Sequence, residues 1–245
     1  MKNILILGAS SDIGLSLLKN LTKDNINKIG VHCNTGCKRL AHFEKSNKER
    51  IKIFKQNLCR KKDCDSLLKK YFSWAKNIDI LIQLNGKISS NKNWQLVSEK
   101  DWNEDLAVNL SAQFFISQIV FKKMKKKGGK IIFTSTSSAD KGGSKNSIGY
   151  GIAKSGLMAL TKILAREGGK FKIKVNCIAP GFILTRLHTK KLKKDKIKIN
   201  KRKKLNVMNE AGNPDEVASM IKCLLSDEIK FITGEVIRID GGDWL

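Results

Sequence analysis

The sequence predicts an α/β fold, built as a doubly wound parallel sheet of about seven strands with helices on both faces. Two observations support this prediction. Short apolar runs alternate with amphipathic helical patterns along the 245 residues, and such alternation implies right-handed β-α-β crossovers and a parallel sheet. The first apolar run, Lys2 to Leu7, leads through a glycine-containing turn directly into a helical pattern. This order is the context in which a glycine motif indicates a nucleotide site.

The remaining elements follow with mostly short connections. We expect strands at Lys2–Leu7, Ile29–Cys33, Ile51–Phe54, Asp79–Ile82, Lys130–Thr134, Lys172–Ile178 and Glu235–Ile239, because each is a short, largely apolar run. We expect helices after Gly14, at about 63–76 and 101–125, from Tyr150 to Gly168, and after Asn213. The last of these begins with a cap, a proline and two first-turn acids, which is typical of a helix start.

The turn after the first strand runs from Gly8 to Gly14. Backbone N–H groups at the start of the following helix suit a pyrophosphate. Gly8 permits the tight turn, and Gly14 permits close packing of helix on strand. These features predict a Rossmann fold. Because the sequence shows neither an internal repeat nor a linker, we expect a single NAD(P)-binding domain over residues 1–245.

The stretch after the second predicted strand bears on the choice of cofactor. An acidic residue there would bind the 2′-hydroxyl of NAD, whereas a basic residue would accept the 2′-phosphate of NADP. The stretch contains Asn34, Lys38 and Arg39 and no acidic residue, which favours NADP(H) over NAD(H). The alternative is that Lys38 and Arg39 only begin a solvated helix.

The chain carries a formal charge of +26, from 48 Lys and Arg against 22 Asp and Glu residues. Such a field attracts nucleic acid, a membrane surface, a phosphorylated cofactor or an acidic carrier protein. Compositional drift toward Lys, Asn and Ile also explains the charge, and we favour drift. The densest run, Lys190 to Lys204, lacks interleaved aromatic residues, so we expect no specific nucleic-acid partner.

The six cysteines and three histidines are scattered, and we expect no metal site. We expect reduced cysteines that pack as small apolar groups, because a disulfide framework is unusual in a long chain without a secretory signal. No apolar run approaches the ~20 residues of a membrane helix, and the run from Met1 to Gly8 is too short for a signal peptide. We therefore expect a soluble cytoplasmic protein without a membrane partner.

Ser137, Tyr150 and Lys154 are the candidate catalytic residues. Tyr150 and Lys154 are four apart in a predicted helix, so they share a face. An ammonium beside a phenol lowers the pKa of the phenol, which would let Tyr150 exchange protons near neutrality. Taken alone, the pair is more simply explained as a half-buried tyrosine and an exposed lysine. Asn109, on a largely apolar helical stretch, is likewise explained alone as a hydrogen-bonded core amide.

Together these motifs resemble the short-chain dehydrogenase/reductase family, and within it the 3-oxoacyl-acyl-carrier-protein reductase-like branch. The resemblance covers essentially the whole chain. It rests on Gly8–Gly14, Asp79–Gly86, Val108–Leu110, the spacing of Ser137, Tyr150 and Lys154, the turn from Pro180 to Thr185, and Ile232–Gly242. The chain departs from the family pattern at Leu7, at Asp12 in place of the middle glycine, at Asn57 in place of an acid, and at Gln83-Leu84-Asn85.

The resemblance implies hydride transfer between NADP(H) and a carbonyl or alcohol. Ser137 would hold the carbonyl oxygen, Tyr150 would donate its proton, and Lys154 would lower the pKa of Tyr150 and bind the nicotinamide ribose. Asn109 would position a water that relays protons to Lys154. Cofactor contacts are implied for Gly8, Ser10, Ser11, Asp12, Ile13, Gly14, Asn34, Lys38, Asn57, Leu58, Asn85, Gly86, Tyr150, Lys154, Pro180, Gly181, Ile183 and Thr185.

The substrate stays open at this point. Phe182, Ile183, Leu184 and Leu187 offer apolar contact within a lysine-rich stretch at about 183–209, which we expect to be a mobile substrate lid. These features suit an acyl chain on an acidic carrier protein, and equally a sugar, polyol or other small ketone or alcohol. A less favoured alternative is a non-catalytic basic binding module on the same scaffold. The resemblance also implies a homotetramer or homodimer.

Overall fold

The computed structural model describes residues 2–23, 27–186, 188–189, 195–243 and 245. Its centre is a sheet of seven strands in the order β3-β2-β1-β4-β5-β6-β7, and every neighbouring pair is parallel. The strands are β1 (Lys2–Leu7), β2 (Asn27–Cys33), β3 (Ile51–Lys55), β4 (Ile80–Gln83), β5 (Gly129–Thr134), β6 (Ile173–Pro180) and β7 (Val236–Ile239). The predicted strands and their parallel arrangement are confirmed.

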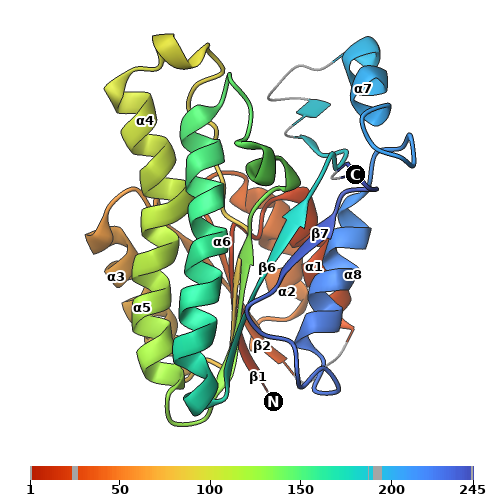
Figure 1. Cartoon of the computed structure of the whole chain (residues 1–245). Coiled ribbons are helices and arrows are strands. Elements are labelled where there is room, and N and C mark those ends of the chain that lie inside the picture. Colours follow the sequence, from red (N-terminus) through yellow and green to blue (C-terminus); the bar gives the residue numbers. More distant parts are fainter. Residues whose placement is uncertain (1, 24–26, 187, 190–194, 244) are drawn as a thin grey trace.

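Helices pack on both faces of this sheet (Figure 1). They are α1 (Asp12–Thr22), α2 (Ala41–Ser46), α3 (Lys61–Ala75), α4 (Glu99–Leu106), α5 (Ala112–Met124), α6 (Ile148–Gly168), α7 (Lys196–Lys203) and α8 (Pro214–Leu225). One apolar core, with Leu67, Val120 and Leu157, lies between the sheet and helices α3, α5 and α6. The opposite core, with Leu17 and Val217, lies under α1 and α8. The predicted fold class is therefore confirmed.

The strand order determines where the ligand crevice lies. From β1 the chain winds outward to β2 and β3, and then returns to form β4 on the other side of β1. In doubly wound sheets, ligands bind outside the carboxyl ends of the strands at this reversal. The turn after β1 and the segment after β4 therefore meet at the crevice.

The structure corrects one predicted helix. The expected continuous helix over 101–125 begins earlier, at Glu99, and is divided into α4 and α5 by a π-helical stretch, Ala107–Ser111. A π-helical insertion adds a residue to the turn and is frequent at functional sites. Apolar periodicity does not reveal such an insertion, because the flanking turns keep an apolar face toward the core.

The end of the chain agrees with the predicted helix start at α8. The Asn213 side chain accepts hydrogen bonds from the backbone N–H groups of Asp215 and Glu216, and the Glu216 carboxylate accepts one from Asn213 N at 2.6 Å. The stretch at about 183–209 contains α7, while residues 187 and 190–194, including Leu187, lie outside the described residues. Within the described part of the chain, every helix is too short or too polar to span a bilayer.

Candidate active site

The Lys154 side chain lies at the carboxyl ends of the central strands. It projects from α6 and is only 2% exposed. Its Nζ donates hydrogen bonds to the carbonyl oxygens of Thr134, at 2.7 Å, and Asn85, at 3.3 Å. Thr134 is the last residue of β5 and Asn85 follows the end of β4, so the ammonium joins the two strand ends beside the crevice. The alternative of an exposed surface lysine is wrong.

Tyr150 lies one turn before Lys154, and the ammonium is 5.6 Å from the centroid of its ring. The sequence predicted that this charge lowers the pKa of the phenol. Instead, burial together with the Asp105 carboxylate raises the pKa of Tyr150 to about 12. Burial also lowers the pKa of Lys154 to about 8. Desolvation disfavours the charged form of both groups, so the predicted direction is wrong and Tyr150 is a protonated acid at neutral pH.

Asn109 occupies the π-helical stretch and is fully buried. Its amide nitrogen donates to the carbonyls of Lys87 and Asp105, both at 2.8 Å, and its Oδ1 accepts from Lys87 N at 2.8 Å. The side chain thus fastens the segment after β4 to the helix. Asn109 is therefore a hydrogen-bonded buried amide, and its side chain lies next to Gly86 at the crevice.

Gly86 lies where three of the candidate catalytic side chains converge. A Cβ added to Gly86 would lie 3.5 Å from Asn109 Oδ1 and 3.8 Å from both Lys154 Nζ and Tyr150 Cε2. The missing side chain therefore leaves space open to all three groups. Ser137 begins a 3-10 helix, Ser137–Lys141, that lies shortly after β5, and it is 5% exposed. Ser155 Oγ on α6 donates to Ala139 O at 3.1 Å, which holds this 3-10 helix against the helix of Tyr150.

The turn after β1 fits a dinucleotide. Gly8 has φ +71°, a left-handed conformation that favours glycine, and an added Cβ would lie 2.7 Å from Asn85 N. Ser11 caps α1 by accepting a hydrogen bond from Gly14 N at 3.1 Å. Among the described residues, the buried Asn85 Oδ1 has no hydrogen-bond partner. A nicotinamide dinucleotide binds at a close-packed glycine turn that leads into a helix N-terminus. The turn after β1 has this form, and the unpartnered Asn85 Oδ1 lies next to it.

Asp12, which departs from the family pattern, is held by cationic and backbone donors. Its carboxylate lies 2.6 Å from Arg39 Nη2 and accepts a hydrogen bond from Arg186 N at 2.6 Å. These hydrogen bonds and charges lower the pKa of Asp12 despite its partial burial, which acts in the other direction. Arg39 also donates to Ser10 O at 2.7 Å. The guanidinium therefore lies against the glycine turn, while the neighbouring Lys38 is exposed.

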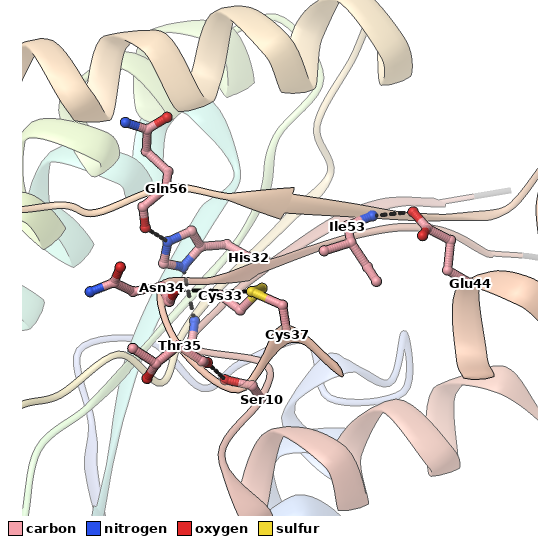
Figure 2. Close-up of a disulfide and its surroundings, with 10 residues drawn as sticks. Ser10, His32, Cys33, Asn34, Thr35, Cys37, Glu44, Ile53 and Gln56 are labelled. Atoms are coloured by element: carbon pink, nitrogen blue, oxygen red, sulfur yellow. Dashed lines mark hydrogen bonds between the residues drawn. A yellow bond between two sulfur atoms is a disulfide. The ribbon is translucent and has the colours of Figure 1, made fainter. Parts of the chain in front are cut away.

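The loop after β2 contains a disulfide (Figure 2). Cys33 and Cys37 are bonded, with their Cα atoms 5.6 Å apart. The prediction of reduced cysteines is therefore wrong for this pair. A left-handed Gly36, at φ +73°, turns the chain back so that the two side chains meet. Ser10 Oγ donates to Thr35 O at 2.8 Å, which fixes the same loop to the glycine turn.

The other predicted cofactor contacts are distributed around the crevice. Asn34 is exposed at the end of β2, and Leu58 is buried beside Asn57 at the end of β3. After β6, Gly181 N donates to Ile239 O at 2.9 Å, and Ile183 is buried. Thr185 Oγ1 lies 3.4 Å from His188 Nδ1. All of these follow the carboxyl ends of strands. Ile13 is half-buried in the first turn of α1.

Sequence reasoning missed two buried polar residues that shape the site. Asp105 accepts a hydrogen bond from Ser89 N at 2.8 Å, and its burial raises its pKa. The carboxylate raises the pKa of Tyr150 in turn. His32 lies within β2 and is 3% exposed. The available signal was the residue type itself, because a histidine inside an apolar strand run has to find polar partners.

The comparisons with known proteins agree with this geometry. A family profile described as "Enoyl-(Acyl carrier protein) reductase" matches residues 8–243. Nodulation protein G of Rhizobium meliloti (strain 1021) is 30% identical, over 98% of this chain and 96% of its own. The 3-oxoacyl-acyl-carrier-protein reductase FabG of Buchnera aphidicola subsp. Schizaphis graminum is 32% identical, over 100% and 98%. The structure of ElxO with NADP bound has a TM-score of 0.88 at 26% identity, covering 99% of this chain and 98% of ElxO.

The chain belongs to the short-chain dehydrogenase/reductase family. It is an NAD(P)-dependent oxidoreductase whose nicotinamide cofactor binds across a Rossmann fold. A short-chain dehydrogenase/reductase of Serratia marcescens, solved as a double mutant, has a TM-score of 0.89 at 23% identity, over 100% of this chain and 98% of that one. That similarity supports the fold alone.

The space at Gly86 gives a direct test of the site. We expect Gly86→Ala to lower turnover at least tenfold, because the new methyl group fills the space shared by Asn109, Lys154 and Tyr150. Stability should change by less than about 1 kcal/mol, because the added contacts are at ordinary van der Waals distances. Steady-state kinetics and thermal unfolding measure the two effects.

Gly169→Ala is the matched control, since nothing lies within 4 Å of a Cβ added there. It should keep both activity and stability. Unchanged turnover in Gly86→Ala would show that the space at Gly86 has no part in the reaction.

Proposed function

We propose that this protein is an NADPH-dependent reductase that converts the ketone of a 3-oxoacyl thioester, carried on an acyl-carrier protein, into a secondary alcohol. The observation that carries the proposal is the convergence of Tyr150, Lys154 and Asn109 on the space at Gly86. The cofactor-binding residues would be those predicted from the sequence, with Gly8 to Gly14 against the pyrophosphate and Lys154 against the nicotinamide ribose. The bound cofactor supplies the hydride.

The protein residues supply orientation and the proton. Ser137 holds the carbonyl oxygen, and Tyr150 donates its proton to that oxygen as negative charge develops. The raised pKa of Tyr150 keeps the proton in place until then. Lys154 stabilises the phenolate that remains, and Asn109, which is bonded to the segment after Gly86, positions a water that returns a proton by way of Lys154.

NADPH is proposed over NADH for three reasons. The loop after β2 contains no acidic residue that would bind a 2′-hydroxyl. The exposed Lys38 and the neighbouring Arg39 lie in the 3-10 helix Cys37–Leu40 of this stretch, and Arg39 is fixed against the glycine turn by Ser10 and Asp12. The structural relative ElxO was solved with NADP bound. These observations favour a cofactor with a 2′-phosphate.

The carrier-linked substrate is supported by relatives and by charge. The FabG relatives are named as 3-oxoacyl-acyl-carrier-protein reductases, and the net charge of +26 attracts an acidic carrier. Phe182 and Ile183 give buried apolar contact, and Leu184 is exposed beside them. We propose that the described residues of the stretch at about 183–209, which include α7, form a mobile lid over this substrate, in a single domain of residues 1–245 that works in the cytoplasm.

The second candidate is a sugar, polyol or other small ketone or alcohol. It is supported because the relatives at about 30% identity also include nodulation protein G, whose name states no carrier-linked substrate.

We also propose a homodimer or homotetramer, because the exposed Phe114 on α5 and the exposed Ile152 and Ile163 on α6 offer apolar contact to a second copy.

The role of Tyr150 is tested by removing its hydroxyl. We expect Tyr150→Phe to lower turnover by about a thousandfold, because it removes the proton donor. The dissociation constant for NADPH, measured by fluorescence, should stay within about twofold. The chain has 2 tyrosines, and Tyr71→Phe is the control, because Tyr71 is buried in the core away from the crevice. Full activity in Tyr150→Phe would contradict the assignment.

The pH dependence follows from Lys154. Its folded-state pKa is about 8, so kcat/KM for carbonyl reduction should be level near neutrality and fall above about pH 8 as the ammonium loses its proton. A guanidinium stays charged in this range, so any residual activity of Lys154→Arg should lack this fall. A wild-type rate that rises through pH 8 would contradict the assigned charge state.

The salt dependence separates the two substrate classes. Reduction of a carrier-linked 3-oxoacyl substrate should fall at least tenfold in kcat/KM between about 50 and 500 mM salt, because salt screens the attraction to the carrier. The rate with a small ketone should change less than about twofold over the same series. Equal salt curves for the two substrates would argue against carrier docking.

A further inference from the structure

His32 connects two cofactor-facing segments that are far apart in the sequence. Its imidazole is buried between the glycine turn and the end of β3 (Figure 2). The Gly8 N–H donates to Nδ1 at 3.3 Å, and Nε2 lies 2.9 Å from the carbonyl oxygen of Gln56. Gln56 directly precedes Asn57 and Leu58, two residues for which the family resemblance implies cofactor contacts.

The two partners determine which nitrogen of the ring carries the proton. A backbone N–H needs the lone pair of Nδ1, and a carbonyl oxygen needs the hydrogen on Nε2. Only the neutral imidazole protonated at Nε2 satisfies both. A second proton on Nδ1 would face the Gly8 N–H directly. Burial lowers the pKa of His32 to about 4, which agrees with a neutral ring at physiological pH.

The backbone of the same strand end reinforces this connection. Ala9 N donates to His32 O at 2.9 Å, so one residue binds the N–H groups of two successive turn residues. Gln56 N donates to Cys33 O at 3.1 Å. The disulfide between Cys33 and Cys37 closes the chain that follows. The imidazole is therefore held in a fixed position and links the end of β3 to the glycine turn.

We propose that His32 is a positioning residue for the cofactor site, which sets the glycine turn at Gly8 through Nδ1 while Nε2 anchors the ring on Gln56. This rests on the proposed function only in that the ligand of the turn is a nicotinamide dinucleotide. The competing explanation is a histidine that only fills the core, in which case the identity of its hydrogen-bonding atoms affects stability and nothing else.

Two substitutions separate the two ring nitrogens. In His32→Asn, the amide oxygen takes the place of Nδ1 and keeps an acceptor for the Gly8 N–H. In His32→Gln, the amide nitrogen takes the place of Nε2 and keeps a donor for Gln56 O, while the acceptor for Gly8 is lost. His42→Gln is the matched control, because His42 is exposed on α2.

Binding of NADPH and amide exchange in the free protein are the two readouts. We expect the dissociation constant for NADPH to rise about tenfold in His32→Gln and less than about threefold in His32→Asn. In ¹⁵N-glycine-labelled protein without cofactor, the Gly8 amide should exchange about tenfold faster in His32→Gln than in wild type or His32→Asn. His42→Gln should match wild type in both measurements.

The outcomes separate this inference from the proposed function. Unchanged Gly8 exchange in His32→Gln overturns the role of His32. If NADPH affinity falls in both variants only in proportion to their loss of stability, the role of His32 is overturned as well. If wild-type protein binds no NADPH, the proposed function fails, and Gly8 exchange in the free protein still decides whether His32 holds the turn.

Discussion

The burial of one cation, the ammonium of Lys154, is the constraint on which the site depends. A buried charge is tolerated only where polar atoms replace its hydration, and here the carbonyls of Thr134 and Asn85 do so. β5 and β4 are neighbouring parallel strands, so their carboxyl ends lie side by side at the crevice. Gly86 then leaves the space beside the ammonium open. The strand ends, the segment after β4 and the start of α6 are thus arranged around a single charge.

The glycine turn depends on a second set of polar contacts. Ser10, Ala9 and Gly8 are each bonded to the end of β2 or the loop that follows it, through Thr35 O, His32 O and the His32 ring. Arg39 and Asp12 form an ion pair across the same turn. A carboxylate in place of a glycine would repel a pyrophosphate, and its pairing with Arg39 offsets that repulsion. The disulfide between Cys33 and Cys37 restrains the loop that carries these partners.

The sequence was sufficient for the fold, because β1 to β7 are short apolar runs at regular spacing, and the capping box at Asn213 is a local signal. It also brought Tyr150, Lys154 and Asn109 to the same region through helix spacing and motif order. It failed where the outcome depends on tertiary burial. The pKa of Tyr150 is raised by desolvation and by the Asp105 carboxylate, and neither effect is visible in a four-residue spacing. The Cys33–Cys37 pair and the contacts of His32 require the conformation at Gly36 and the register of β2 with β3.

The central claim is that this protein transfers hydride from NADPH to a carbonyl. A panel of 3-oxoacyl thioesters, sugars and small ketones, assayed with NADPH and NADH side by side, tests it most directly. We expect NADPH to be consumed in equal amount to alcohol formed, with a 3-oxoacyl thioester as the best substrate and NADH at least about tenfold slower. Folded protein that oxidises neither NADPH nor NADH with any carbonyl, and produces neither NADPH nor NADH with any alcohol, would contradict the account.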